Sequence, residues 1–447
     1  MPKTKKEIGG IDDKKPKVYK SLRGFRDILP DSQVYWDKVE DAARKIATDY
    51  SFDRIRLPYL EQTQLFERSV GKGTDIVDKE MFSFVDPSNT KVTLRPEATA
   101  QVVRTYIEHG MLNKPQPVKL WYFGPMFRHD RPQAGRYRQF WQFGLEAIGS
   151  NEPIIDAQII IICFRLLKEL GLDVTVQINS IGTPESRRDY IMELVSYFKQ
   201  FRRQLSETDK KRLQKNPLRL LDSKEPEIQE LKVDAPQIVD WLDDTSKQDF
   251  MKVLEYLDEA EVPYELNPFL VRGLDYYSKT VFEIIPNVTR EVVNENEEEK
   301  SQNALGGGGR YDGLVEMLGG REGTPAMGAA LGIERIILAM KAQEVPINKQ
   351  REIDVFFCQL GEAARRKGLS VFEQFRSAGI TTGEAFGKGS LKTQLEMADK
   401  LKAKVALILG QKEVLDGTII IRDMESGAQE IVDVKKVVEI VQKQLGG

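Results

Sequence analysis

A pair of strand-length segments in the first third of the chain constrains its fold more than any other feature. Residues 118–123 and 138–148 are rich in aromatic and aliphatic side chains. Between them lies a polar stretch that contains glycine and the arginines Arg128, Arg131 and Arg136. Segments of this composition are typical of strands. We therefore expect two antiparallel strands joined by a long basic loop.

Helical and strand patterns extend on both sides of this pair. Apolar residues at spacings of three and four predict helices over 34–50 and 154–170. Between them, Pro96 is expected in the first turn of a helix that runs to about residue 106, because its missing N–H has no helical partner there. Apolar runs predict strands over 52–57, 81–85, 92–94, 172–178 and 281–285. A Gly/Ala-rich helix is expected over 327–340.

These patterns indicate an α+β fold of several domains. The stretch 184–260 is helix-patterned and charged, whereas strand patterns lie on both sides of it. From residue 350 onward strands and helices alternate as in an α/β unit. The expected organisation is a flexible segment over 1–20, an antiparallel-sheet domain in two parts over 21–183 and 261–346, a helical insertion over 184–260 and an α/β domain over 350–447.

The composition of the chain excludes several classes of protein. Lys+Arg number 66 against 69 Asp+Glu, so the net charge of −3 gives no global basic field for an indiscriminate polyanion binder. Two histidines and two well-separated cysteines argue against a structural zinc site or a disulfide framework, and the thiols fit a reducing compartment. The longest apolar run, 159–164, is too short to span a bilayer, and the lysine-rich start lacks a signal's apolar region. A cytoplasmic protein without a membrane partner is expected.

Several clusters combine charge with aromatic residues or glycine. Arginines beside Phe127, Tyr137, Phe140 and Trp141 suit a purine that carries phosphates, although a simply solvated basic loop is the alternative. Residues 94–99 place a carboxylate and a hydroxyl at a helix start, where a cap is the favoured role of Thr99 taken alone. The glycine run 306–309 matches neither the Rossmann fingerprint nor the P-loop.

Taken together, these clusters resemble the histidyl-tRNA synthetase family of class II aminoacyl-tRNA synthetases. Residues 52–61 (FDRIRLPYLE) resemble class II motif 1, the dimer element, with Ser51 where a glycine is usual. Residues 124–140 resemble motif 2 and residues 332–335 (GIER) motif 3. Two further motifs are specific to the histidine enzymes: residues 271–277 (VRGLDYY) and 308–313 (GGRYDG). The resemblance runs from residue 22 to the C-terminus.

The resemblance implies roles for the arginines in ATP chemistry. Arg128 would bind the α-phosphate and the histidine carboxylate, with Arg272 opposite it, and these two are the expected catalytic residues. Arg136 and Arg335 would clamp the β- and γ-phosphates, and Phe140 would stack the adenine against Arg335. Mg²⁺ is expected with ATP as substrate, and no protein metal site is expected.

The resemblance also implies a histidine pocket, a tRNA site and a homodimer. Glu97, Thr99 and Gln142 would hold the ammonium of L-histidine, and Glu146 and Tyr277 the imidazole. The other residues expected at the histidine site are Arg272, Tyr276 and Tyr311. Arg131 and Gln133 would contact the acceptor end of the histidine tRNA, and the C-terminal α/β domain would bind its anticodon.

Local clusters of basic residues supply candidate tRNA contacts beyond the motifs. Between residues 363 and 412 ten bases stand against four acids, which would form a phosphate-binding face. Residues 202–219 carry seven bases against two acids and could embrace the acceptor arm. A solvated, lysine-rich helix face is the alternative for the first of these clusters.

Three other functions compete with a histidine–tRNA ligase. One is a non-catalytic, histidyl-synthetase-like regulatory subunit of ATP phosphoribosyltransferase. Such subunits typically lack the anticodon-type domain and have eroded motifs. The presence of Arg128, Arg272 and Arg335 in their motifs therefore argues against this function. The others are a tRNA-sensing module attached to a kinase and a class II synthetase for another amino acid.

Overall fold

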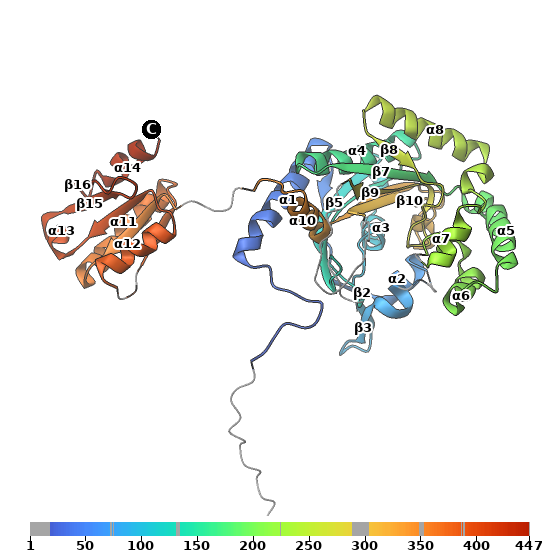
Figure 1. Ribbon diagram of the computed structural model, residues 1–447, viewed down its shortest axis with the longest axis horizontal. Helices are drawn as coiled ribbons and strands as arrows, with labels where there is room; N and C mark the ends of the chain where they lie inside the picture. The colour runs from blue at the N-terminus through green and yellow to red at the C-terminus, as the bar shows by residue number, and fades with distance from the viewer. Residues whose placement is uncertain are drawn as a thin grey trace, which may run out of the picture. The chain divides into compact units, whose positions relative to one another are not determined.

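The computed structural model divides into two compact units, residues 1–347 and 348–447. It describes residues 18–347 except 72–73, 75, 131–134, 224 and 288–303, and residues 353–446 except 386 and 388. Most of the predicted flexible segment 1–20 therefore lies outside the described residues, as do Arg131 and Gln133. Figure 1 shows the elements of each unit.

An eight-stranded sheet forms the centre of the first unit, in the order β1-β5-β6-β11-β10-β9-β7-β8. The strands are β1 (Asp53–Arg54), β5 (Val118–Phe127), β6 (Gln139–Ile148), β7 (Val174–Ser180), β8 (Tyr264–Leu266), β9 (Ser278–Pro286), β10 (Gly306–Arg310) and β11 (Ala326–Gly332). β1 and β8 run parallel to their neighbours, and the other pairs are antiparallel. The predicted antiparallel pair is confirmed as β5 and β6, which stay in register over their full length.

Four helices cover one face of this sheet: α1 (Pro30–Asp49), α4 (Pro153–Glu169), α8 (Asp244–Glu259) and α10 (Ile333–Ala342). α4 buries residues around most of its circumference, because it lies between the sheet and the helices α1 and α8. Apolar residues with no polar face are what such a position requires. The result is one continuous apolar core that supports the sheet from this side.

The opposite face carries a second group of helices and a second apolar core. They are α3 (Thr99–Glu108), α5 (Pro184–Gln200), α6 (Glu207–Lys215), η3 (Pro217–Leu220), α7 (Pro226–Lys232), η4 (Ile238–Trp241) and α9 (Leu314–Met317). Side-chain caps start α5 and α6: Thr183 accepts from the Ser186 N–H and Ser206 from the Asp209 N–H. Within the stretch 184–260, α5–α7 therefore pack in this second core, whereas α8 packs in the first.

A small sheet and three short helical segments complete the first unit. The sheet has the order β2-β4-β3, with β2 (Leu60–Gln62), β3 (Phe82–Val85) and β4 (Lys91–Leu94). The helical segments are α2 (Thr63–Ser69), η1 (Ile76–Glu80) and η2 (Met111–Asn113). The hydroxyls of Thr63 and Thr93 share a 2.7 Å hydrogen bond that joins the start of α2 to β4.

Two local predictions were wrong. The Gly/Ala-rich segment 327–340 is not one helix, because its first part is strand β11 and only its second part is α10. β11 lies between β6 and β10, and its backbone approaches that of β10 so closely that a Cβ at Gly308 would lie 2.1 Å from the carbonyl oxygen of Gly328. Pro96 also lies outside the predicted helix, which begins at Thr99, while the Glu97 carboxylate accepts from the Ala100 N–H.

The second unit is the predicted α/β domain. Its sheet has the order β13-β12-β14-β15-β16, in which β13, β12 and β14 run parallel and the rest antiparallel. The elements are β12 (Val355–Gln359), α11 (Glu362–Ser377), β13 (Thr382–Glu384), α12 (Leu391–Lys400), β14 (Val405–Leu409), α13 (Gln411–Asp416), β15 (Thr418–Asp423), β16 (Gln429–Asp433) and α14 (Val437–Leu445). Across the described part of both units, no helix is long and apolar enough to cross a membrane.

Candidate active site

A cavity of about 470 Å³ lies on the first unit, over the middle of the large sheet. Its wall includes residues of β5, β6, β9, β10 and β11, the segment 272–277 and the start of α10. Eleven of the predicted site residues line it: Glu97, Thr99, Arg128, Arg136, Phe140, Gln142, Arg272, Tyr276, Tyr277, Tyr311 and Arg335. The structure thus brings together segments that are more than 200 residues apart in the sequence.

Glu146 lies immediately behind this wall. Its side chain is 1% exposed; Oε1 accepts a 2.7 Å hydrogen bond from the Thr99 hydroxyl and Oε2 a 2.6 Å bond from the Tyr311 hydroxyl. Burial raises the pKa of Glu146 to about 8. Because the Thr99 hydroxyl donates to this carboxyl group and Ala98 occupies the N-cap position, the cap role favoured for Thr99 alone was wrong.

The positive charges on the cavity wall come from arginines, which stand beside an equal number of acids. Arg128 donates from Nε to the Pro96 carbonyl oxygen over 2.8 Å, and its guanidinium lies 5.3 Å from the centre of the Phe140 ring. Arg335 donates to the Ala304 carbonyl oxygen over 2.7 Å. Burial, together with the positive charges of Arg136 and Arg128, lowers the pKa of Arg335 to about 10. Like charges held together in this way favour a polyanionic ligand.

Arg272 pairs with an acid that sequence reasoning missed. Its Nη1 donates to the carboxylate of Glu283 on β9, and the guanidinium lies 5.9 Å from the centre of the Tyr277 ring. The Nε of Arg272 is buried and has no hydrogen-bond partner. The signal for Glu283 was available, because it is a single acid within the apolar run 281–285.

A buried ion pair fixes the segment that carries Tyr311. Arg310 is 1% exposed and donates to both carboxylate oxygens of Asp156 on α4 and to the Ser150 carbonyl oxygen. Asp312 accepts from Arg310 over 3.2 Å and from the Ala326 N–H over 3.1 Å. The role of this pair is positional, because Tyr311 has little freedom to turn away from Glu146 when its neighbours on both sides are bound.

A buried carboxylate likewise fixes the position of motif 3. Glu334 lies in the first turn of α10, and both of its carboxylate oxygens accept from the Trp141 N–H on β6, the shorter bond being 2.9 Å. Burial raises the pKa of Glu334 to about 7. This contact holds the N-terminal turn of α10, and with it Arg335, against the strand that carries Phe140.

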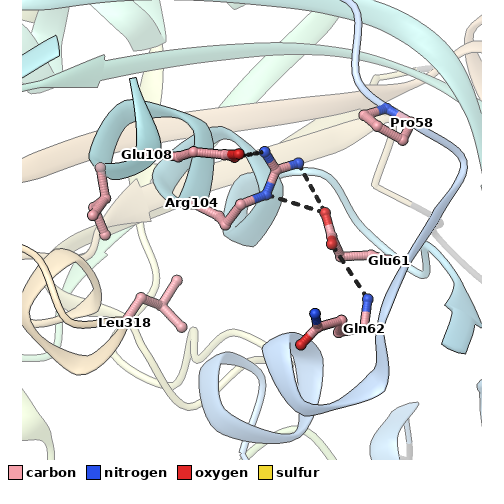
Figure 2. A pocket seen from close by; sticks show the side chains of 7 residues that line it. Pro58, Glu61, Gln62, Arg104, Glu108 and Leu318 are labelled. Atoms are coloured by element: carbon pink, nitrogen blue, oxygen red, sulfur yellow. Dashed lines mark hydrogen bonds and ion pairs between the residues drawn. The ribbon is translucent and has the colours of Figure 1, made fainter. Parts of the chain in front are cut away.

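The motif 1 segment lies beside a second depression, shown in Figure 2. Arg104 of α3 donates to Glu61 from Nε and Nη2, over 3.1 and 2.8 Å, and to Glu108 from Nη1 over 2.6 Å (Figure 2). Nearby on motif 1, Tyr59 is 53% and Leu60 44% exposed. An apolar edge of this kind is open to a protein partner.

The sequence pattern predicted that the basic residues over 363–412 form one phosphate-binding face. This prediction was wrong, because those of the two helices α11 and α12 lie on opposite faces of the sheet. Arg365, Arg366, Lys367 and Arg376 belong to α11, which packs on the sheet face that carries Phe357 and Leu407. Lys392 and Lys400 belong to α12, which packs on the opposite face with Phe356 and Ile408. Strand alternation explains the difference, because neighbouring residues of β12 and β14 point to opposite sides.

Among the residues that the structure describes, no group of three or more His, Cys, Asp or Glu side chains could hold a metal ion. Glu283 is engaged by Arg272, and Glu334 by the Trp141 N–H.

The fold is that of a class II aminoacyl-tRNA synthetase catalytic domain followed by an anticodon-binding domain. A family model described as histidyl-tRNA synthetase matches residues 24–336, and one described as anticodon binding domain matches residues 345–444. The chain belongs to the histidyl-tRNA synthetase family.

Solved structures agree with this assignment. Apo histidyl-tRNA synthetase of S. aureus is 34% identical, with 95% of this chain and 100% of that chain covered and a TM-score of 0.77. Two structures at 20% identity and a TM-score of 0.62 share the fold. They are histidyl-tRNA synthetase of Nostoc sp. PCC 7120 (96% and 100% covered) and an ATP phosphoribosyltransferase regulatory subunit/histidyl-tRNA synthetase of Bacillus halodurans C (89% and 99% covered).

Proposed function

We propose that this protein is a histidine–tRNA ligase. In the first step a carboxylate oxygen of L-histidine attacks the α-phosphorus of ATP, the bond to the bridging oxygen breaks, and pyrophosphate leaves. In the second step a ribose hydroxyl at the 3′ end of the tRNA attacks the carbonyl carbon of histidyl-adenylate, and AMP leaves. The observation that carries this proposal is one cavity lined both by Arg128, Arg136, Arg272 and Arg335 and by acids and tyrosines.

The arginines suit the first step because negative charge accumulates where two anions meet. The Nε of Arg272 is buried without a hydrogen-bond partner, and a ligand oxygen would satisfy it. Preorganised donors of this kind contribute about 3–4 kcal/mol to a transition state. Arg128 and Arg272 would act on the reacting carboxylate and α-phosphate, and Arg136 and Arg335 on the departing pyrophosphate. Mg²⁺, bound with ATP, would supply further positive charge next to the phosphates of the nucleotide.

The acids and tyrosines suit the amino acid. Glu97, which is 4% exposed and lines the cavity, would accept from the ammonium together with Thr99 and Gln142. Glu146 and Tyr277 would hold the two imidazole nitrogens, with Tyr276 and Tyr311 around the ring. A buried site built for two ring hydrogen bonds rejects amino acids that lack them, by about 10⁴-fold.

The transfer RNA and a second copy of the chain are the proposed macromolecular partners. Residues 345–444 match an anticodon-binding domain, which supports binding of the histidine tRNA. Arg131 and Gln133 would contact its acceptor end. The exposed apolar residues Tyr59 and Leu60 beside Arg104 support a homodimer formed through motif 1.

A regulatory role is the second candidate, because one structure that shares this fold is described as an ATP phosphoribosyltransferase regulatory subunit/histidyl-tRNA synthetase. A purely regulatory chain would not need four arginines on one cavity wall. It would also not need the buried carboxyl of Glu146 bonded to both Thr99 and Tyr311. We therefore favour the ligase.

Charging of tRNA with each of the twenty amino acids separates these functions. A ligase charges tRNA with histidine alone and exchanges pyrophosphate into ATP only when histidine is present. Charging with another amino acid would assign a different synthetase. No charging at all, combined with stimulation of an added ATP phosphoribosyltransferase, would establish the regulatory role instead.

A further inference from the structure

The segment 272–277, which carries Arg272, Tyr276 and Tyr277, is bound by residues of the helical stretch 184–260. Arg219 of η3 donates from Nη2 to the Gly273 carbonyl oxygen over 2.5 Å. Asn216, at the C-terminus of α6, donates from Nδ2 to the Asp275 carboxylate over 3.0 Å. Arg187 of α5 donates to the Tyr277 carbonyl oxygen over 2.8 Å. Three hydrogen bonds thus reach every second residue of this short segment.

The turn that supplies two of these bonds is anchored in the apolar core. Leu220 and Leu221 are at most 1% exposed, and they belong to the same cluster as Tyr276 and Tyr277. Asn216 and Arg219 are themselves joined by a backbone hydrogen bond of 3.0 Å. The polar side chains therefore project from a fixed base, and they are not free to follow a segment that moves.

The cavity itself includes Arg219. It is part of the wall together with Arg272 and Gly273, although no class II motif contains it. On the other side of the segment, a Cβ at Gly71 would lie 2.5 Å from the Asp275 carboxylate, so the Asp275 side chain is confined between residue 71 and Asn216. Movement of the turn would be transmitted directly to the backbone that presents Arg272 and the two tyrosines.

We propose that Asn216 and Arg219 are positioning residues that hold the segment 272–277 in its ligand-binding shape. Through these two residues the helical stretch 184–260 determines the shape of the amino-acid site. This proposal rests on the proposed function, since its substrate is the histidine of that reaction. Both residues act through the segment, and neither needs to touch the reacting atoms.

The test compares Asn216→Ala and Arg219→Ala with Lys215→Ala, a change at an exposed neighbouring base of the same helix. Loss of one hydrogen bond predicts a KM for histidine raised about 3- to 10-fold in pyrophosphate exchange, with the KM for ATP within twofold of the parent. Arg219→Lys, which keeps a donor, recovers part of the effect. Asn216→Asp places a second carboxylate against Asp275 and raises the KM further than Asn216→Ala does.

Hydrogen exchange of the backbone supplies a readout that does not depend on activity. Amides of residues 272–277 should exchange faster in Asn216→Ala and Arg219→Ala than in the parent and in Lys215→Ala, while those of β7 are unchanged. Equal exchange and equal KM in all four proteins would overturn the proposal, as would an equal loss in Lys215→Ala. If the parent shows no histidine-dependent activity, the ligase assignment fails, and the exchange result still decides the positioning role.

Discussion

The hydroxyl of Tyr311 and the carboxyl group of Glu146 are joined across an intervening strand. Glu146 lies on β6 and Tyr311 directly follows β10, and β11 runs between these two strands. The 2.6 Å bond can form because the β11 residue paired with Glu146 is Gly328, where a Cβ would lie 1.7 Å from Glu146 Oε2. Glycine at position 328 therefore leaves the space that the Glu146 carboxyl group occupies when it bonds to Tyr311.

Replacement of Glu146 by alanine should impair histidine binding selectively. We expect the KM for histidine to rise about 10- to 100-fold, because a ring nitrogen of the bound histidine would be left without its hydrogen-bond partner inside a buried pocket. The KM for ATP should change less than twofold in pyrophosphate exchange. Glu146→Gln keeps an acceptor for Tyr311 and Thr99, so its KM for histidine should lie between those of the parent and Glu146→Ala. An unchanged KM for histidine in Glu146→Ala would remove this residue from the pocket.

The raised pKa of Glu146 predicts a stability that depends on pH. Burial brings this pKa to about 8 from an ordinary value of 4.5, so between these values the folded chain holds a proton that the unfolded chain has released. The free energy of unfolding contributed by this group therefore falls as the pH rises from 4.5 to 8. Urea unfolding without ligand should show that the free energy of unfolding of the parent declines between pH 4.5 and 8 relative to that of Glu146→Gln. Parallel curves for the two proteins would mean that this carboxyl does not titrate in that window.

Replacement of Arg272 by alanine should slow chemistry more than binding. Removing a preorganised cation from the reacting centre predicts a loss of about 10²–10³-fold in the rate of adenylate formation, measured in a single turnover. The change also leaves Glu283 without its cationic partner. Glu283→Gln alone is the control for that second effect. Normal single-turnover activation in Arg272→Ala would exclude a catalytic role.

A charge at Leu60 should weaken the proposed dimer. This side chain is 44% exposed on the edge strand β2, beside the Glu61–Arg104 contact of Figure 2. Leu60→Asp should shift sedimentation from dimer toward monomer, because it would bury a carboxylate against a second copy. Leu415→Asp, an exposed leucine of the second unit, is the matched control. A parent that sediments as a monomer would exclude the dimer at once.

Glycine at position 51 should stabilise the chain. Ser51 follows α1 with a φ of 60°, in the left-handed region, at the position where the family usually has glycine. Relief of the Cβ clash, less the extra entropy of an unfolded glycine, predicts a gain of about 0.5–1 kcal/mol. Thermal unfolding of Ser51→Gly should show a higher Tm than the parent, with Ser51→Ala near the parent. A lower Tm for Ser51→Gly would contradict this account.

The sequence by itself determined the elements whose signal is local. The aromatic and aliphatic runs of β5 and β6 and the apolar repeats of α1 and α4 are properties of neighbouring residues, and all four elements form where they were expected. The motif strings also identified the family and most of the cavity wall. Each of these signals can be read within a window of about twenty residues.

Only the tertiary structure decided what depends on distant partners. Residues 327–332 carry mostly glycine and alanine, which have almost no side-chain pattern, so pairing with β10 and β6 makes them a strand. The partners Asp156 for Arg310 and Arg219 for Gly273 lie 154 and 54 residues away. A side chain's type tells which bonds it can make, but the packing of the sheet and helices selects the partner.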